Sequence, residues 1–243
     1  MAIKNRNIAA DAKIDLSKIN LVTGKRTFYE DFDDTTEAGG ALNLDASAIY
    51  GFDKAVKNTP TCIVQRDSTV LLDSDADGDV IMLYQTSDWS VSKEPEMAVR
   101  IKDIESLDNC ILQFGWTEGN DAFAAPDANA VAGDKDKAYV EFRGTGGSFE
   151  DDWVLYTQNN SAAGAETGVS FGFGAATGTA YEIRVKLTSG GGVHASVDNT
   201  TRYASSAAVP KTLTDMRPFV RVNANGAAAS LKLDTFFVSE NRS

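Results

Sequence analysis

The stretch YEIRVKLT, residues 181–188, alternates strictly between apolar side chains and polar or charged ones. Its apolar members are Tyr181, Ile183, Val185 and Leu187. Side chains at alternate positions of an extended chain share one face, whereas a helix would need a period near 3.6 residues. The stretch therefore predicts an antiparallel β-strand with one buried and one solvated face.

The same period of two recurs along most of the chain after residue 60. In MAVRIK, residues 97–102, every second residue is apolar, and in SLKLDTFFV we expect Leu231, Leu233 and Phe237 to share a face. Turn-forming stretches separate these runs, among them TSGGGV at 188–193 and NANGAA at 223–228. Many short strands with regular turns predict an all-β, antiparallel two-sheet jelly-roll sandwich.

The first residues follow a different pattern. In IKNRNIAADAKIDLSKI, residues 3–19, Ile8, Ala12, Leu16 and Ile19 recur at helical spacing among charged side chains. So thin an apolar stripe does not stabilise a helix alone in water, so it needs the sandwich, sister copies or a partner protein to pack against. We expect an N-terminal arm over residues 1–24 and a sandwich domain over residues 25–243.

The composition excludes several classes of partner. The net charge of -12 argues against nucleic acid, whose phosphates need an excess of Lys and Arg, while it suits a particle surface or cation binding. The chain has no run of about 18 apolar residues and its start, MAIKNRN, lacks the apolar core of a secretory signal. We therefore expect that the protein is made in a host cytoplasm and does not insert into a membrane. Cys62 and Cys110 lie in apolar runs and are expected to be buried thiols, although their adjacency is left open.

One motif has the form of a cation site. In DSDADGD, residues 73–79, Asp73, Asp75 and Asp77 precede Gly78 at the spacing of the first half of a calcium loop. The twelfth position, where such a loop has a bidentate Glu, is Tyr84. The alternative is a solvated hairpin turn, for which Asp and Gly are equally suited.

No pattern indicates catalysis, and we expect no catalytic residues and no cofactor other than calcium. The one histidine, His194, lies in VHASV at an outward position beside Ser196, with no nucleophile motif near it. The acidic run at residues 150–152 is consecutive, so its carboxylates point to opposite faces of a strand.

Aromatic residues and long loops leave a sugar-binding role open. A stacking platform could be formed by Trp89, Trp116, Trp153, Tyr156 and Phe149. The alternative is that the tryptophans are core residues. The stretches at 118–136 and 159–168 lack periodicity, and loops of that length in a sandwich either bind ligands or simply connect strands.

Residues 27–242 resemble the concanavalin A-like or LamG-like jelly roll found in viral and phage structural proteins. The resemblance is carried by TFYEDFDD (27–34), residues 95–119, AYVEFRG with DDWVLYTQNN (138–160), residues 180–199 and residues 217–242. It implies that the strand containing FGWT pairs with a later strand that carries Trp153 and Thr157. It implies little about function, because this sandwich occurs in lectins, hydrolases and inert shells.

The segment NRNIAADAKIDLSKI, residues 5–19, is similar to N-terminal segments of tailed-phage fibre and head-decoration proteins. That similarity implies an attachment or trimerisation arm that buries Ile8, Ile14, Leu16 and Ile19 against sister chains or a capsid. The function expected is therefore a non-enzymatic bacteriophage virion protein, trimeric and exposed on the particle as capsid decoration or head fibre. The alternative is a carbohydrate-binding, receptor-binding tail-fibre domain that uses the two long loops and calcium.

Overall fold

The computed structural model describes residues 25–30, 42–43, 52–65, 69–74, 76–107, 110–118, 136–144, 151–159, 167–204, 209, 212–224 and 228–241. These residues are mostly β-strand, with a 3-10 helix η2 at Val91–Lys93. None of the helices they form is long and apolar enough to cross a membrane. The expected arm residues Ile8, Ile14, Leu16 and Ile19 lie outside the described part of the chain, as does Asp75.

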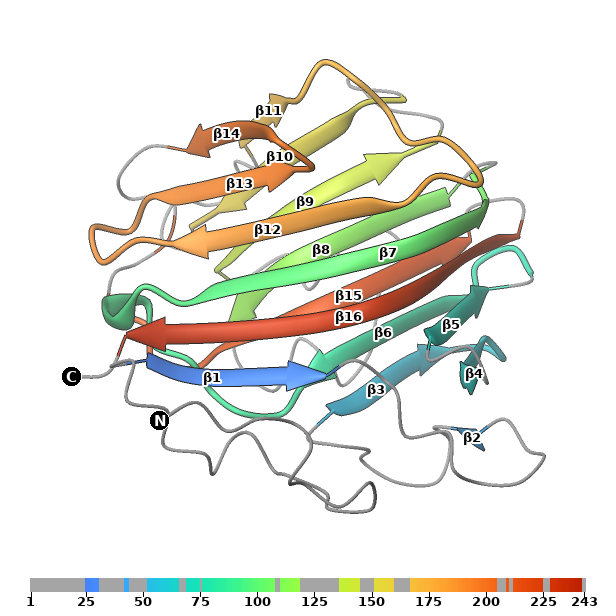
Figure 1. The fold of residues 1–243 in the computed structure, drawn as a ribbon, viewed down its shortest axis with the longest axis horizontal. Helices are drawn as coiled ribbons and strands as arrows, with labels where there is room; N and C mark the ends of the chain where they lie inside the picture. The colour runs from blue at the N-terminus through green and yellow to red at the C-terminus, as the bar shows by residue number, and fades with distance from the viewer. Residues whose placement is uncertain are drawn as a thin grey trace, which may run out of the picture.

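One sheet contains nine of the described strands. Their order is β14-β13-β12-β7-β16-β5-β4-β2, and β1 also pairs with β16. The bounds are β14 (Thr200–Ala204), β13 (Val193–Val197), β12 (Tyr181–Leu187), β7 (Glu96–Ser106), β16 (Ala229–Asn241), β5 (Thr69–Ser74), β4 (Thr61–Gln65), β2 (Leu42–Asn43) and β1 (Lys25–Glu30). In Figure 1 this sheet lies in front.

The second sheet contains seven of the described strands and lies behind the first (Figure 1). Its order is β11-β10-β9-β8-β15-β6-β3, and each neighbouring pair is antiparallel. The bounds are β11 (Thr167–Ser170), β10 (Trp153–Gln158), β9 (Lys137–Arg143), β8 (Cys110–Glu118), β15 (Met216–Ala224), β6 (Val80–Gln85) and β3 (Phe52–Lys57). The antiparallel two-sheet sandwich expected from the sequence is confirmed.

Apolar side chains from both sheets form one core between them. In β12, the alternate apolar residues from Tyr181 to Leu187 are all buried, as the sequence pattern of this strand predicts. Opposite it, the indole N–H of Trp116 on β8 donates a 2.9 Å hydrogen bond to the carbonyl oxygen of Val185 on β12. This bond joins the middle of one sheet to the middle of the other through the apolar core.

Both cysteines are buried free thiols, as expected from the apolar runs around them. Cys62 lies on β4 and Cys110 on β8, so they belong to different sheets. Burial raises the pKa of the Cys62 thiol to about 12, against a smaller opposing effect of the Lys54 charge. Cys62 is therefore protonated, and a poor nucleophile, at neutral pH.

The strand β16 departs from strict alternation. Its pairing with β7 shifts register between Leu233 and Thr235, which is the signature of a bulge. Phe236 is consequently fully buried and packs edge-to-face on Phe52 at a centroid distance of 4.9 Å, while Phe237 is half-buried. The prediction that Phe237 shares a face with Leu231 and Leu233 is wrong, because one extra residue reverses the facing of everything after it.

Two further expectations about connectivity are also wrong. The FGWT segment of β8 does not pair with the strand carrying Trp153 and Thr157, because β9 lies between β8 and β10. The DSDADGD segment is not a hairpin turn, since β5 and β6 belong to different sheets and the segment crosses between them. At the crossing, Gly78 takes a φ of 79° and donates a 2.9 Å hydrogen bond to the carbonyl of Ala224.

We predict that Phe236→Ala lowers the free energy of unfolding by about 3–5 kcal/mol, because it leaves a cavity between two sheets. Phe237→Ala, the matched control, removes the same ring from a half-buried position and is expected to cost less than half as much. Urea denaturation followed by tryptophan fluorescence measures both. A larger loss for Phe237→Ala than for Phe236→Ala would contradict the bulge.

Candidate functional site

The two sheets differ in the faces that they turn away from the core, here called outer faces. On the nine-stranded sheet the outer face carries exposed residues such as Arg100, Arg184, His194 and Tyr203. The outer face of the seven-stranded sheet also carries polar and charged residues, but many of them are buried. Those at most 2% exposed are Gln113, Thr117, Lys137, Glu141, Arg221 and Asn223. Charged side chains are rarely so fully buried, which singles this face out.

Four of its side chains form a hydrogen-bonded chain across three strands. The guanidinium Nη1 of Arg221 on β15 donates to Gln113 Oε1 on β8 at 2.9 Å, and Gln113 Nε2 donates to Glu141 Oε2 on β9 at 2.6 Å. Arg143 Nη2 then lies 3.0 Å from Glu141 Oε1. The register fixes this polar network, because Arg221, Gln113 and Glu141 are directly opposite one another on neighbouring strands.

An aromatic row crosses the same face one position along. In register order it comprises Tyr84, Phe219, Gly115, Tyr139 and Tyr156. The ring of Tyr139 lies 5.7 Å from that of Tyr156 and 6.2 Å from that of Phe219, by centroids. A Cβ on Gly115 would lie 2.3 Å from the carbonyl oxygen of Ala138, so a glycine is required where the row passes over β8.

The far end of the aromatic row is held by a tyrosine hydroxyl. Tyr84 donates a 3.1 Å hydrogen bond to Asp53 Oδ2 on the edge strand β3. Burial raises the pKa of Tyr84 to about 12, and the charge and hydrogen bond of Asp53 act in the same direction. Tyr84 is therefore a neutral hydrogen-bond donor throughout the physiological pH range.

A third row lies on the other side of the aromatic row, at the strand ends. Its members in register order are Arg217, Thr117, Lys137 and Gln158. β8 ends at Glu118 and β10 at Gln158, so the stretches at 119–135 and 160–166 both leave from this end of the sheet. The two long loops expected to form a binding rim are thus attached to strand ends that lie together, although their own residues are outside the described part.

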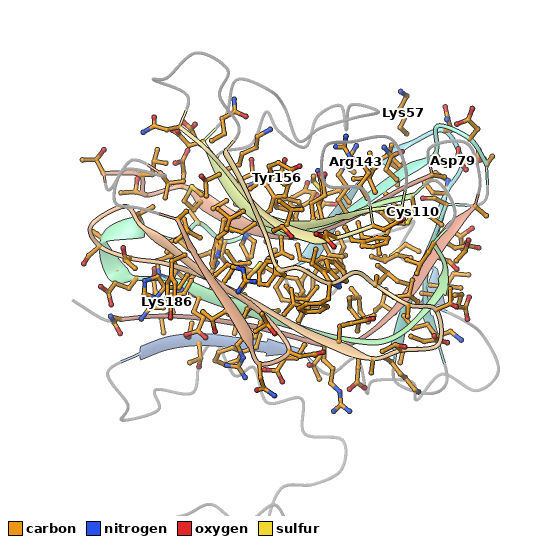
Figure 2. All side chains as sticks on the ribbon, turned by 90° about the horizontal axis from the view of Figure 1, so that it is seen from above. Lys57, Asp79, Cys110, Arg143, Tyr156 and Lys186 are labelled. Atoms are coloured by element: carbon orange, nitrogen blue, oxygen red, sulfur yellow. The ribbon has the colours of Figure 1, made fainter. Side chains whose placement is uncertain are left out.

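Within the polar network and the aromatic row, two side chains are exposed enough to contact a ligand directly. The Arg143 side chain is 31% exposed, and Tyr156 is half-buried at the end of the aromatic row. Figure 2 shows both residues on the same side of the molecule, with Lys186 of β12 on the opposite side. The network and the aromatic row therefore each end in a partly exposed group on β9 and β10.

The expected calcium site remains a prediction. Asp73 is half-buried in β5, Asp77 is exposed, and Asp75 lies outside the described residues. Asp79 Oδ2 instead accepts a 3.3 Å hydrogen bond from the backbone N–H of Ala76, which fixes the turn. Among the described residues there is no group of three His, Cys, Asp or Glu side chains suited to a metal ion.

The aromatic platform considered from the sequence is largely excluded. Trp89, Trp116 and Trp153 are at most 1% exposed and belong to the core. Tyr156 does lie on an outer face, whereas Phe149 is outside the described residues. His194 is exposed and points outward, as expected, with its ring edge-to-face on Tyr203 at 4.7 Å.

The polar network was not among the predicted sites, although the sequence contains a signal for it. In CILQFGWT and KAYVEFR every second residue belongs to the core, which places Gln113 and Glu141 on the opposite face. Alternation alone predicts that such polar residues are solvated. Only the structure shows that they are buried, adjacent and bonded to Arg221, 108 positions along the chain from Gln113.

Comparison with known proteins shows the fold. No protein-family model and no curated protein sequence matches the chain. Among solved structures, the Emp47p carbohydrate recognition domain matches with a TM-score of 0.60 and 11% identity, over 100% of each chain. A β-1,3-glucanase from Mycobacterium marinum has a TM-score of 0.57 and 14% identity, over 87% of this chain and 97% of its own. The family 7 alginate lyase A1-II′ has a TM-score of 0.54 and 12% identity, over 77% and 86%.

These similarities confirm the concanavalin A-like jelly roll that the sequence resembles. At sequence identities of 14% or less, these similarities show a shared fold and nothing about function. The similar structures include a carbohydrate recognition domain and enzymes, so the fold by itself is compatible with binding and with catalysis.

We predict that Glu141→Gln lowers the free energy of unfolding by about 2 kcal/mol, because it removes the buried carboxylate that accepts from Gln113 and pairs with Arg143. The matched control is Glu182→Gln, which removes a carboxylate from Arg184 on the exposed outer face of β12 and is expected to cost less than 1 kcal/mol. Urea denaturation of the two variants measures both values. Equal losses would contradict a stabilising role of the buried Glu141 carboxylate.

Proposed function

We propose that this protein binds a carbohydrate on the outer face of the seven-stranded sheet. The observation that carries the proposal is the polar network Arg221–Gln113–Glu141–Arg143 lying directly beside the aromatic row. A sugar presents hydroxyl groups and apolar C–H faces, so it is bound by a few fixed polar groups next to aromatic rings. Both kinds of group are held in register on rigid central strands of this sheet.

The energetics of the network also favour a ligand. Burying Arg221 and Glu141 carries a desolvation cost that an apolar pair of the same shape would avoid. Departures from ordinary burial rules concentrate at functional sites, where the cost is tolerated for binding. The fold is shared with proteins whose names specify carbohydrate recognition and polysaccharide cleavage, which supports the same ligand class.

Binding without cleavage is the form of the proposal that we favour. Both oxygens of Glu141 are engaged, one by Gln113 and the other by Arg143. The only histidine, His194, lies on the nine-stranded sheet and faces away from the site. Among the described residues, the Glu141 carboxylate at the centre of the site is thus committed to structure, and the His194 imidazole lies on the other sheet.

The test is binding to a glycan array followed by titration calorimetry with the best ligand. Arg143→Ala and Tyr156→Ala should each weaken binding at least tenfold, the effect expected for a lost charged hydrogen bond or stacking ring. The matched controls are Arg184→Ala and Tyr203→Ala, which remove an arginine and a tyrosine from the outer face of the other sheet. Thermal melting confirms that all four variants are folded.

Equal losses in the test and control variants would contradict binding on this face. Release of oligosaccharides from the bound polysaccharide would contradict binding without cleavage. The titration repeated with a chelator tests the role of Asp73, Asp75 and Asp77: an unchanged affinity would contradict calcium-dependent binding.

We also propose that residues 1–24 anchor the 25–243 domain to a larger assembly. The sequence feature that supports this is the thin apolar stripe of the arm, which needs a surface to cover it. The assembly consistent with the sequence resemblance is a bacteriophage particle, with the protein exposed as a trimeric capsid decoration or head fibre and the sugar-binding face directed outward.

The arm is tested by the mass of the full chain in solution. Light scattering should give a trimer, and Leu16→Asp combined with Ile19→Asp should convert it to a monomer, because charge enters the buried stripe. Asp11→Ala combined with Asp15→Ala changes the same segment outside the stripe and should leave the trimer intact. A trimer that survives Leu16→Asp with Ile19→Asp would show that the arm does not hold the chains together.

A further inference from the structure

The outer face of the seven-stranded sheet differs in charge from the chain as a whole. The chain has a net charge of -12. Among the described residues of this face and its edges, the acidic groups are Asp53, Glu141, Asp88 beside Arg217 and Asp152 beside Ser170. The cationic groups are Lys57, Lys137, Arg143, Arg217 and Arg221, so cations are in slight excess here. A local excess of cations on an acidic protein favours an anionic ligand at that face.

Thr117 occupies the centre of the row at the strand ends. Its side chain is fully buried, and its Oγ1 has no hydrogen-bond partner among the described residues. Buried hydroxyl groups are almost always hydrogen-bonded, so an exception calls for an explanation. A hydroxyl can donate a hydrogen bond to an anionic oxygen. Thr117 lies near the end of β8, the central strand of the sheet, so the strand holds this donor in a fixed position.

Two cations flank this hydroxyl. Thr117 is directly opposite Arg217 on β15 and directly opposite Lys137 on β9. Side chains at such opposite positions begin about 5 Å apart, within reach of a single carboxylate or sulfate group. Arg217 uses its Nε for Asp88 Oδ1 at 2.8 Å, and a guanidinium has further N–H donors at its other nitrogens.

The same row is connected to the aromatic row. Lys137 Nζ lies 5.7 Å from the ring centroid of Tyr139, and Tyr139 contacts the half-buried Tyr156. A pyranose on the tyrosines would therefore have a cation and a hydroxyl at the next position along the strands. A charged substituent on the ring is the ligand group that this spacing fits.

We infer that the carbohydrate ligand is an anionic polysaccharide, one of whose acidic groups binds at Thr117 between Arg217 and Lys137. This inference rests on the proposed sugar-binding function and specifies the class of sugar. The group is a carboxylate or a sulfate, because each has at least two negatively charged acceptor oxygens that a guanidinium and a hydroxyl can bind together.

The test compares polygalacturonate, dextran sulfate and unsubstituted dextran as ligands of the full chain by titration calorimetry. Polygalacturonate or dextran sulfate should bind at least tenfold more tightly than dextran, and the difference should shrink as salt is raised from 50 to 500 mM, because screening weakens charge pairing.

Thr117→Val and Arg217→Gln are the informative variants. Thr117→Val keeps the side-chain shape and should weaken binding of the acidic polymer about tenfold while leaving the thermal midpoint unchanged or raised, since a buried hydroxyl without a partner is removed. Arg217→Gln should weaken binding by a similar factor and reduce its salt dependence. The matched controls are Thr235→Val and Arg100→Gln, an opposite pair on the outer face of the nine-stranded sheet.

The outcomes separate this inference from the proposed function. Dextran binding as tightly as the acidic polymers, but lost in Arg143→Ala, would leave sugar binding intact and overturn the anionic ligand. Full affinity in Thr117→Val would overturn the placement of the acidic group. If no tested sugar shows binding that is weakened by Arg143→Ala and Tyr156→Ala, both the proposed function and this inference are overturned.

Discussion

The central strands of the seven-stranded sheet are buried on both faces, and the rest of the structure depends on how each face meets that constraint. Toward the other sheet, β8, β9 and β15 supply the apolar side chains of the core, and Trp116 adds a hydrogen bond to Val185 across it. On the outer face they supply Gln113, Glu141 and Arg221, which are linked by hydrogen bonds. A strand with two buried faces tolerates neither an unpaired charge on one side nor a register shift on the other.

The aromatic row requires a close approach of the backbones of β8 and β9. Tyr139 lies against Phe219 on one side and Tyr156 on the other, while Gly115, opposite both Tyr139 and Phe219, has no space for a side chain. The carbonyl oxygen of Ala138 and the Cα and Cβ of Tyr139 on β9 occupy the volume that a larger residue at position 115 would take. The polar network beside the aromatic row is therefore held between fixed rings and fixed strands, which preorganises it for a ligand.

The two outer faces differ in how far their charged side chains are buried, and this difference locates the candidate site. The charges of the nine-stranded sheet are paired in the open, as in Arg184 with Glu182 and Arg100 with Asp234, where such pairs contribute little to stability. On the seven-stranded sheet, by contrast, Glu141 and Arg221 are buried and linked through Gln113. Solved structures with this fold include binding domains and enzymes, so it is the residues of this face, rather than the sandwich, that distinguish one function from another.

Side-chain alternation and apolar content were enough to predict the strands, the sandwich and the buried thiols, because both are local properties that a single segment carries. It also placed His194 outward, from the same alternation. The tertiary structure alone decided that Phe236 rather than Phe237 enters the core, since the bulge arises where β16 pairs with β7. It alone decided that Arg221 meets Gln113 and Glu141, because residues far apart in the chain become neighbours only through strand order. The candidate site is built from such pairings. Alternation predicts the face of the sheet on which a residue lies, but it does not predict which residue lies opposite on the neighbouring strand.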